Sequence, residues 1–225
     1  MKSLTASFNL PIFTQSDAAC AALGEHRCGK LRDVDNGLYL LYSEGIGLGI
    51  IAAGRVVFGN WNDAGEIGHM PFLDDGDYCS CGNVGCLETV AAKWALVKTA
   101  RQIVQAGGQI AFRHSCDPKT MGIEELCSMA AAGDLLARNM FVKAGKAIGR
   151  ALAISAALLD PSVIVLGGDL VEANDYAPLI SSLQETFHLL AAHRTPQPIR
   201  FEISSLDWDA TVIGGAELVF SELVV

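Results

Sequence analysis

The stretch from Gly65 to Glu88, GEIGHMPFLDDGDYCSCGNVGCLE, determines most of what can be inferred about this chain. Cys79, Cys81 and Cys86 fall within eight residues, and His69 lies ten residues before Cys79. Three thiolates and one imidazole form a closed tetrahedral zinc site, and the glycines from Gly82 to Gly85 permit the tight turn that such a site requires. The sequence therefore predicts a zinc site whose ligands are His69, Cys79, Cys81 and Cys86.

Neither simple packing nor disulfide bonding accounts well for these cysteines. Cysteine also serves as a small buried hydrophobic residue, but packing alone is a poor explanation for three cysteines in a glycine-rich loop. The chain has seven cysteines, and an odd number argues against a complete disulfide framework. Four protein ligands leave no open position for water, so we expect the zinc to be structural.

The composition limits the class of protein. The 225 residues are 51% hydrophobic and 18% charged, which suits one large domain or two small ones with a sizeable core. No apolar run is long enough to cross a membrane and no secretory signal is present, so we expect a cytoplasmic protein without membrane contact. The net charge is −9, and the sequence contains no run of basic residues that could bind the phosphates of a nucleic acid. We therefore expect any DNA contact to come from a domain that is not in this chain.

Strands and helices alternate along the chain, which indicates an α/β fold around a mainly parallel or mixed sheet. The patterns predict strands at Leu10–Thr14, Gly37–Tyr42, Val163–Leu166 and Ile199–Ile203, and two short strands within Ile50–Phe58. They predict helices at Ala18–Glu25, Leu87–Gln105, Ile123–Ala132, Leu135–Leu159, Ala177–Leu190 and Thr211–Phe220. The glycines at 45, 47 and 49 are interpreted as a turn.

The cysteine-containing segment resembles the signature of the ROK family (repressors, open reading frames, kinases), which reads GExGH followed by CxCGxxGCxE. The matching positions are Gly65, Glu66, Gly68, His69, Cys79, Cys81, Gly82, Gly85, Cys86 and Glu88. Three further stretches resemble family motifs in the same order: Ser16 to Ala19, Gly45 to Gly49, and Ile164 to Gly168.

The resemblance implies an actin-like, ribonuclease H-like fold of the hexokinase type with a zinc-binding loop at residues 65–88. Residues 1–35 then correspond to the end of the N-terminal lobe, and residues 36–225 to the C-terminal lobe. The family's DxGGT phosphate loop and the winged helix-turn-helix of its repressors have no counterpart in this sequence.

The resemblance also implies a sugar site made by Ser16, Asp17, Glu66, His69 and Glu88. Carboxylates accept strong charge-assisted hydrogen bonds from sugar hydroxyls, and in a kinase Asp17 would be the general base. From the residues alone, Glu66 and Glu88 can equally be surface charges, and Asp17 can be a helix N-cap.

The sequence departs from the family's kinases at Glu44, where a carboxylate stands in the place of part of a phosphate loop. This negative charge opposes the binding of a nucleotide phosphate. The alternative is that the Glu44 side chain points into solvent. We therefore expect zinc but not ATP as a cofactor.

The favoured hypothesis is a sugar-sensing and oligomerising domain of a transcriptional repressor, which binds a small sugar or amino sugar and forms a homodimer or homotetramer. The alternatives are the larger part of an ATP-dependent sugar kinase, and a protein-binding module with a vestigial sugar site.

Overall fold

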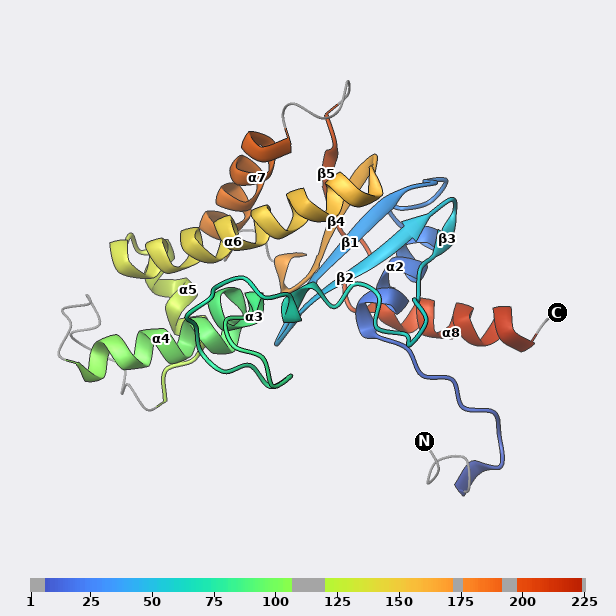
Figure 1. Ribbon diagram of the computed structural model, residues 1–225, viewed down its shortest axis with the longest axis horizontal. Helices are drawn as coiled ribbons and strands as arrows, with labels where there is room; N and C mark the ends of the chain where they lie inside the picture. Colours follow the sequence, from blue (N-terminus) through green and yellow to red (C-terminus); the bar gives the residue numbers. More distant parts are fainter. Residues whose placement is uncertain (1–6, 107–119, 172–175, 192–197, 224–225) are drawn as a thin grey trace.

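The computed structural model describes residues 7–106, 120–171, 176–191 and 198–223. Its centre is a five-stranded mixed sheet with the strand order β3-β2-β1-β4-β5 (Figure 1). The strands are β1 (Gly37–Tyr42), β2 (Ile46–Ala52), β3 (Arg55–Val56), β4 (Val163–Gly168) and β5 (Arg200–Ile203). β1, β4 and β5 run parallel, whereas β2 and β3 are antiparallel to their neighbours. The predicted mixed α/β sheet is confirmed.

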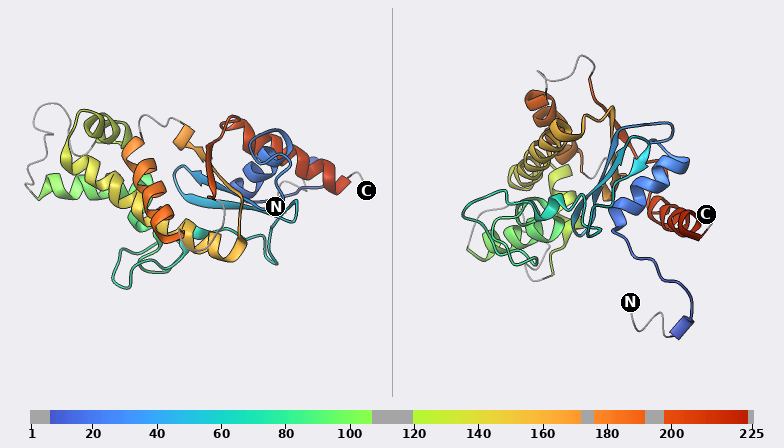
Figure 2. Two further views of the ribbon diagram at one scale, coloured as in Figure 1. Left: turned by 90° about the horizontal axis from the view of Figure 1, so that it is seen from above. Right: turned by 45° about the vertical axis from the view of Figure 1, so that its right-hand side comes forward.

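Helices cover both faces of the sheet (Figures 1 and 2). On one face α2 (Asp17–Cys28) packs against α8 (Asp209–Leu223). The other face carries α3 (Leu87–Ala91), α4 (Lys93–Gln105), α5 (Ile123–Ala131), α6 (Leu135–Leu159) and α7 (Ala177–Ala191). Two short 3₁₀ helices are also present, η1 (Ile67–His69) and η2 (Asp169–Val171).

The central strand β1 is buried along its whole length because both of its faces are covered. Leu38, Leu40 and Tyr42 face the larger core, formed with α3 to α7. Tyr39 and Leu41 face the smaller core, formed with α2. This alternation follows from the two-residue period of side chains along a strand.

Three predictions of local structure were wrong. Leu10–Thr14 forms no strand, and Leu10 is 61% exposed. Gly47 and Gly49 lie inside β2 rather than in a turn. Glycine is required at both positions because a side chain there would collide with Ala18 on α2. The helix predicted at Leu87–Gln105 is divided at Ala92, whose extended backbone (φ −69°, ψ 155°) separates α3 from α4.

The helix predicted at Leu135–Leu159 is found with those bounds as α6. Asp134 caps it, because its carboxylate accepts hydrogen bonds from the amides of Leu136 and Ala137 at 2.9 and 2.8 Å.

None of the helices in the described part of the chain combines the length and the apolar composition that crossing a lipid bilayer requires.

Candidate metal centre and adjoining carboxylate cleft

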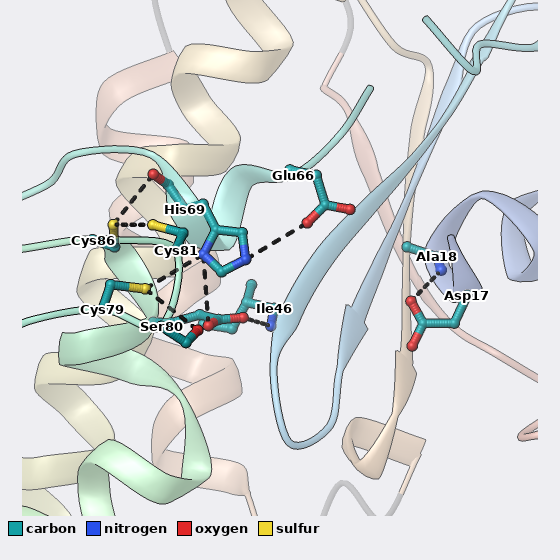
Figure 3. A network of polar contacts seen from close by, with 10 residues as sticks. Asp17, Ala18, Ile46, Glu66, His69, Cys79, Ser80, Cys81 and Cys86 are labelled. Carbon is teal, nitrogen blue, oxygen red and sulfur yellow. Dashed lines mark hydrogen bonds and ion pairs between the residues drawn. The ribbon is translucent and has the colours of Figure 1, made fainter. Parts of the chain in front are cut away.

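The four predicted metal ligands lie together in the structure (Figure 3). One ring nitrogen of His69 and the Sγ atoms of Cys79, Cys81 and Cys86 all lie within 4.8 Å of one another. His69 Nδ1 is 3.4 Å from Cys79 Sγ, and Cys81 Sγ is 3.6 Å from Cys86 Sγ. A tetrahedral zinc ion with bonds of about 2.3 Å to sulfur and about 2.0 Å to nitrogen separates its ligand atoms by roughly 3.5 to 3.8 Å. The donor set and its spacing therefore fit a metal ion of this kind.

Backbone contacts hold the loop in this shape. The amide of Cys79 donates to the carbonyl of Asn83 at 2.8 Å, and the amide of Gly82 donates to the carbonyl of Cys79 at 3.0 Å. Gly82 and Gly85 have φ angles of +94° and +68°, which residues with a side chain rarely adopt. The hydrogen bond at Asn83 lowers the pKa of the exposed Cys81 thiol, which favours the thiolate that a metal binds.

His69 connects this cluster to two glutamates. Its Nδ1 faces the cysteines, and its Nε2 lies 3.9 Å from Glu66. A carboxylate oxygen of Glu88 also lies 3.9 Å from Nδ1. With a metal on Nδ1, Nε2 carries the proton and faces Glu66, so the cluster fixes the direction of the imidazole donor.

Three of the predicted sugar-binding residues line one small cleft. Asp17, Glu66 and Glu88 border a hollow of about 100 Å³, together with residues of the turn between β1 and β2. Asp17 is the first residue of α2, and Glu88 lies in the first turn of α3. Partial burial raises the pKa of the Glu66 carboxyl; His69 opposes this rise, and the negative charge of Asp17 adds to it.

The other two predicted residues do not border this cleft. His69 stands behind it, in contact with both glutamates. Ser16 is the N-cap of α2, because its hydroxyl accepts a hydrogen bond from the amide of Ala19 at 3.2 Å. The alternative interpretation of Asp17 as the N-cap is therefore wrong, since Ser16 performs that role and leaves Asp17 at the cleft.

The structure also shows charged residues that the sequence analysis did not connect. Glu44 is 84% exposed in its side chain, but it is not free in solvent: Lys93 lies 3.0 Å away. The same lysine lies 2.6 Å from Asp169, which follows β4. No local pattern joins residues 44, 93 and 169, so only the fold reveals this group.

Comparison with known proteins assigns the family. Residues 1–222 match the ROK family. The chain belongs to that family. It is 34% identical over 200 residues to the N-acetylglucosamine repressor of Escherichia coli O157:H7, and the match covers 88% of this chain and 48% of the repressor. The chain thus spans about half the length of the curated relatives that it matches.

Two solved ROK structures share the fold. A ROK transcriptional regulator, homologous to the Mlc protein of E. coli, superposes with a TM-score of 0.80 at 30% identity, over 96% of this chain and 53% of the regulator. A ROK glucokinase from Streptomyces griseus, solved with glucose and AMPPNP, gives a TM-score of 0.79 at 26% identity, over 96% of this chain and 70% of the kinase. The sheet and helices described above are therefore the hexokinase-type fold of ROK proteins.

Proposed function

We propose that this chain is the sugar-recognising part of a ROK-family transcriptional repressor of carbohydrate metabolism. The observation that carries the proposal is the cleft in which Asp17, Glu66 and Glu88 converge, directly against a Cys₃His cluster. Three carboxylates in one hollow suit a ligand that donates several hydrogen bonds, as a hexose or an amino sugar does. The similarity to an N-acetylglucosamine repressor supports the same class of ligand.

In this proposal the metal is zinc, and its role is structural. His69, Cys79, Cys81 and Cys86 supply all four ligands, so no position remains for a substrate. Bound zinc supplies rigidity: it orders the loop that carries Glu66 before His69 and Glu88 after Cys86. The glutamates then lose less conformational entropy when a sugar binds.

The remaining parts of the proposal rest on the family. The assignment of residues 1–35 to the end of one lobe and of 36–225 to the other stays a proposal, as do the homodimeric or homotetrameric state and the cytoplasmic location. DNA contact would come from a helix-turn-helix in a domain outside this chain.

The kinase alternative has one observation in its favour. Asp17 stands in the carboxylate cleft at the start of α2, where it can accept a proton from a sugar hydroxyl. Against this, the ion pairs of Lys93 with Glu44 and Asp169 lie at the carboxyl ends of β1 and β4, where ligands of open α/β sheets generally bind. The two carboxylates outnumber the single lysine, and this excess negative charge disfavours the phosphates of a nucleotide. Phosphorylation of glucose by ATP with the purified protein would decide for the kinase.

The test of the proposed function is calorimetric titration of hexoses and N-acetylhexosamines into the zinc-loaded protein. We expect one sugar to bind, and Glu66→Gln or Glu88→Gln to weaken it roughly ten- to hundred-fold, because each removes a charge-assisted hydrogen bond of about 1.5–3 kcal/mol. Glu185→Gln is the matched control, since Glu185 is exposed on α7 and away from the cleft. Equal affinities for all four proteins would disprove the site, and no binding by any sugar would favour a module with a vestigial site.

A further inference from the structure

Lys93, Glu44 and Asp169 form an ion-paired group at the carboxyl ends of β1 and β4, next to the carboxylate cleft. Lys93 Nζ lies 3.0 Å from Glu44 Oε1 and 2.6 Å from Asp169 Oδ2. Glu44 belongs to the turn between β1 and β2, and Asp169 follows the last residue of β4. β1 and β4 are parallel neighbours, so the two carboxylates lie at the same end of these strands, with the lysine between them.

The position of Lys93 is not explained by its own helix. It is the first residue of α4, where the helix dipole disfavours a positive charge. Its side chain is only 14% exposed, which also disfavours the charge. Burial lowers the pKa of Lys93, but hydrogen bonds to Asp169 and Glu44 outweigh this effect and raise the pKa above its ordinary value. The two carboxylates are therefore what keeps a charged lysine at this place.

A second contact joins the same two segments. The amide of Ile46 donates a hydrogen bond of 2.9 Å to Glu88 Oε1 (Figure 3). Ile46 lies two residues after Glu44, and Glu88 lies five residues before Lys93. The turn between β1 and β2 is thus attached to the α3–α4 segment at two points, one through Lys93 and one through a carboxylate of the cleft.

We propose that Lys93 is a positioning residue of the sugar cleft, which holds the β1–β2 turn against α3 and thereby keeps the Glu88 carboxylate in its binding geometry. Without the lysine, Glu44 and Asp169 are left as unpaired like charges at the carboxyl ends of β1 and β4. Their repulsion favours outward movement of the β1–β2 turn. That movement lengthens the Ile46–Glu88 hydrogen bond. The part of this inference that concerns sugar affinity rests on the proposed function, whereas the coupling between Lys93 and Ile46 does not.

The test compares Lys93→Met with Lys93→Arg and with Lys98→Met. Lys98 is the matched control because it also belongs to α4 and pairs with a carboxylate, Asp77, at 2.8 Å, but on the metal loop rather than on the turn. The first measurement is hydrogen exchange of the Ile46 amide by NMR. We expect about tenfold faster exchange in Lys93→Met, since local opening becomes easier, and little change in the other two proteins.

The second measurement is sugar affinity in the same proteins. We expect Lys93→Met to bind the sugar about tenfold more weakly, and Lys93→Arg to stay within about twofold of the native protein because it keeps the charge. Zinc content should be the same in all of them, which separates positioning from general damage. If Lys93→Met does not fold, Glu44→Gln replaces it; that substitution removes the turn's ion pair alone and should change both readouts in the same direction.

The outcomes are distinguishable. Unchanged Ile46 exchange in Lys93→Met overturns the inference, and so does faster exchange with undiminished affinity for a sugar that the native protein binds. If the native protein binds no sugar, the proposed function fails, and the Ile46 amide still decides whether Lys93 holds the turn.

Discussion

Two exposed cysteines of this chain differ in their surroundings rather than in their accessibility. Cys81 lies in the four-ligand cluster, whereas Cys28 ends α2 and is not part of it. We expect Cys81→Ser to reduce bound zinc from about one ion per chain to well below that, and to lower the unfolding free energy by about 3 kcal/mol or more, because metal binding is coupled to folding of the loop. Elemental analysis and thermal unfolding measure the two effects.

Cys28→Ser is the control, and it should retain full zinc and nearly native stability. If Cys81→Ser kept its zinc, or if the native protein purified without chelator held none, the structural role proposed for the metal would be wrong.

The metal cluster was predictable residue by residue because its ligands are close in the sequence. Cys79, Cys81 and Cys86 are brought together by one glycine-containing turn, and only His69 had to be added from the preceding segment. Lys93 and Asp169 were not predictable in this way. Their contact depends on β1 and β4 lying side by side, which is a property of the sheet and leaves no trace in either local sequence.

At the scale of elements, the contact between α2 and α8 depends on glycines on both helices, Gly24 on α2 and Gly214 on α8. A side chain at Gly214 would overlap the backbone carbonyl of Cys20 on α2, whereas a side chain at the adjacent Gly215 would meet nothing within 4 Å. We expect Gly214→Ala to destabilise the protein by about 1–3 kcal/mol through overpacking. Gly215→Ala should instead stabilise it by about 0.5–1 kcal/mol, because alanine is the better residue inside a helix.

Chemical denaturation of the two variants measures this difference. Asp17 begins α2, so Gly214→Ala should also weaken sugar binding if the helix is displaced, while Gly215→Ala should not. Equal stabilities would show that α2 and α8 do not approach each other as closely as the structure describes.

The elements themselves were predicted where packing repeats regularly. α6 has the predicted bounds because apolar residues return at helical spacing over its whole length and Asp134 caps its start. The division between α3 and α4 at Ala92 was not predictable, since alanine and its neighbours favour a continuous helix. The close approach of α2 to β2 overrides local preference in the same way: the glycines there are needed for helix packing rather than for a turn.

At the scale of the whole molecule, the charges are unevenly distributed. The net charge is −9, yet α6 contains no acidic residue and exposes Arg138, Lys143, Lys146 and Arg150. Several other cations are already paired with carboxylates within 4.0 Å: Arg27, Lys30, Lys93, Lys98 and Arg200. The outer face of α6 is therefore the part of the described surface best suited to meet a polyanion.

We predict that this chain alone does not bind duplex DNA at physiological salt. Four phosphate contacts give affinities that fall steeply as salt rises, and even non-specific binding proteins reach only about 10⁻⁴ to 10⁻⁶ M under those conditions. Apart from these four cations, the chain has 12 basic residues against 25 acidic ones, and this excess of negative charge repels the duplex. Fluorescence anisotropy with a labelled duplex, at low and at physiological salt, measures this. Weak binding at low salt that Lys146→Glu abolishes would assign the residual affinity to α6 and agree with the prediction. Micromolar, sequence-dependent binding at physiological salt would contradict it, because it would place an operator-reading surface on a chain whose described residues form no such surface.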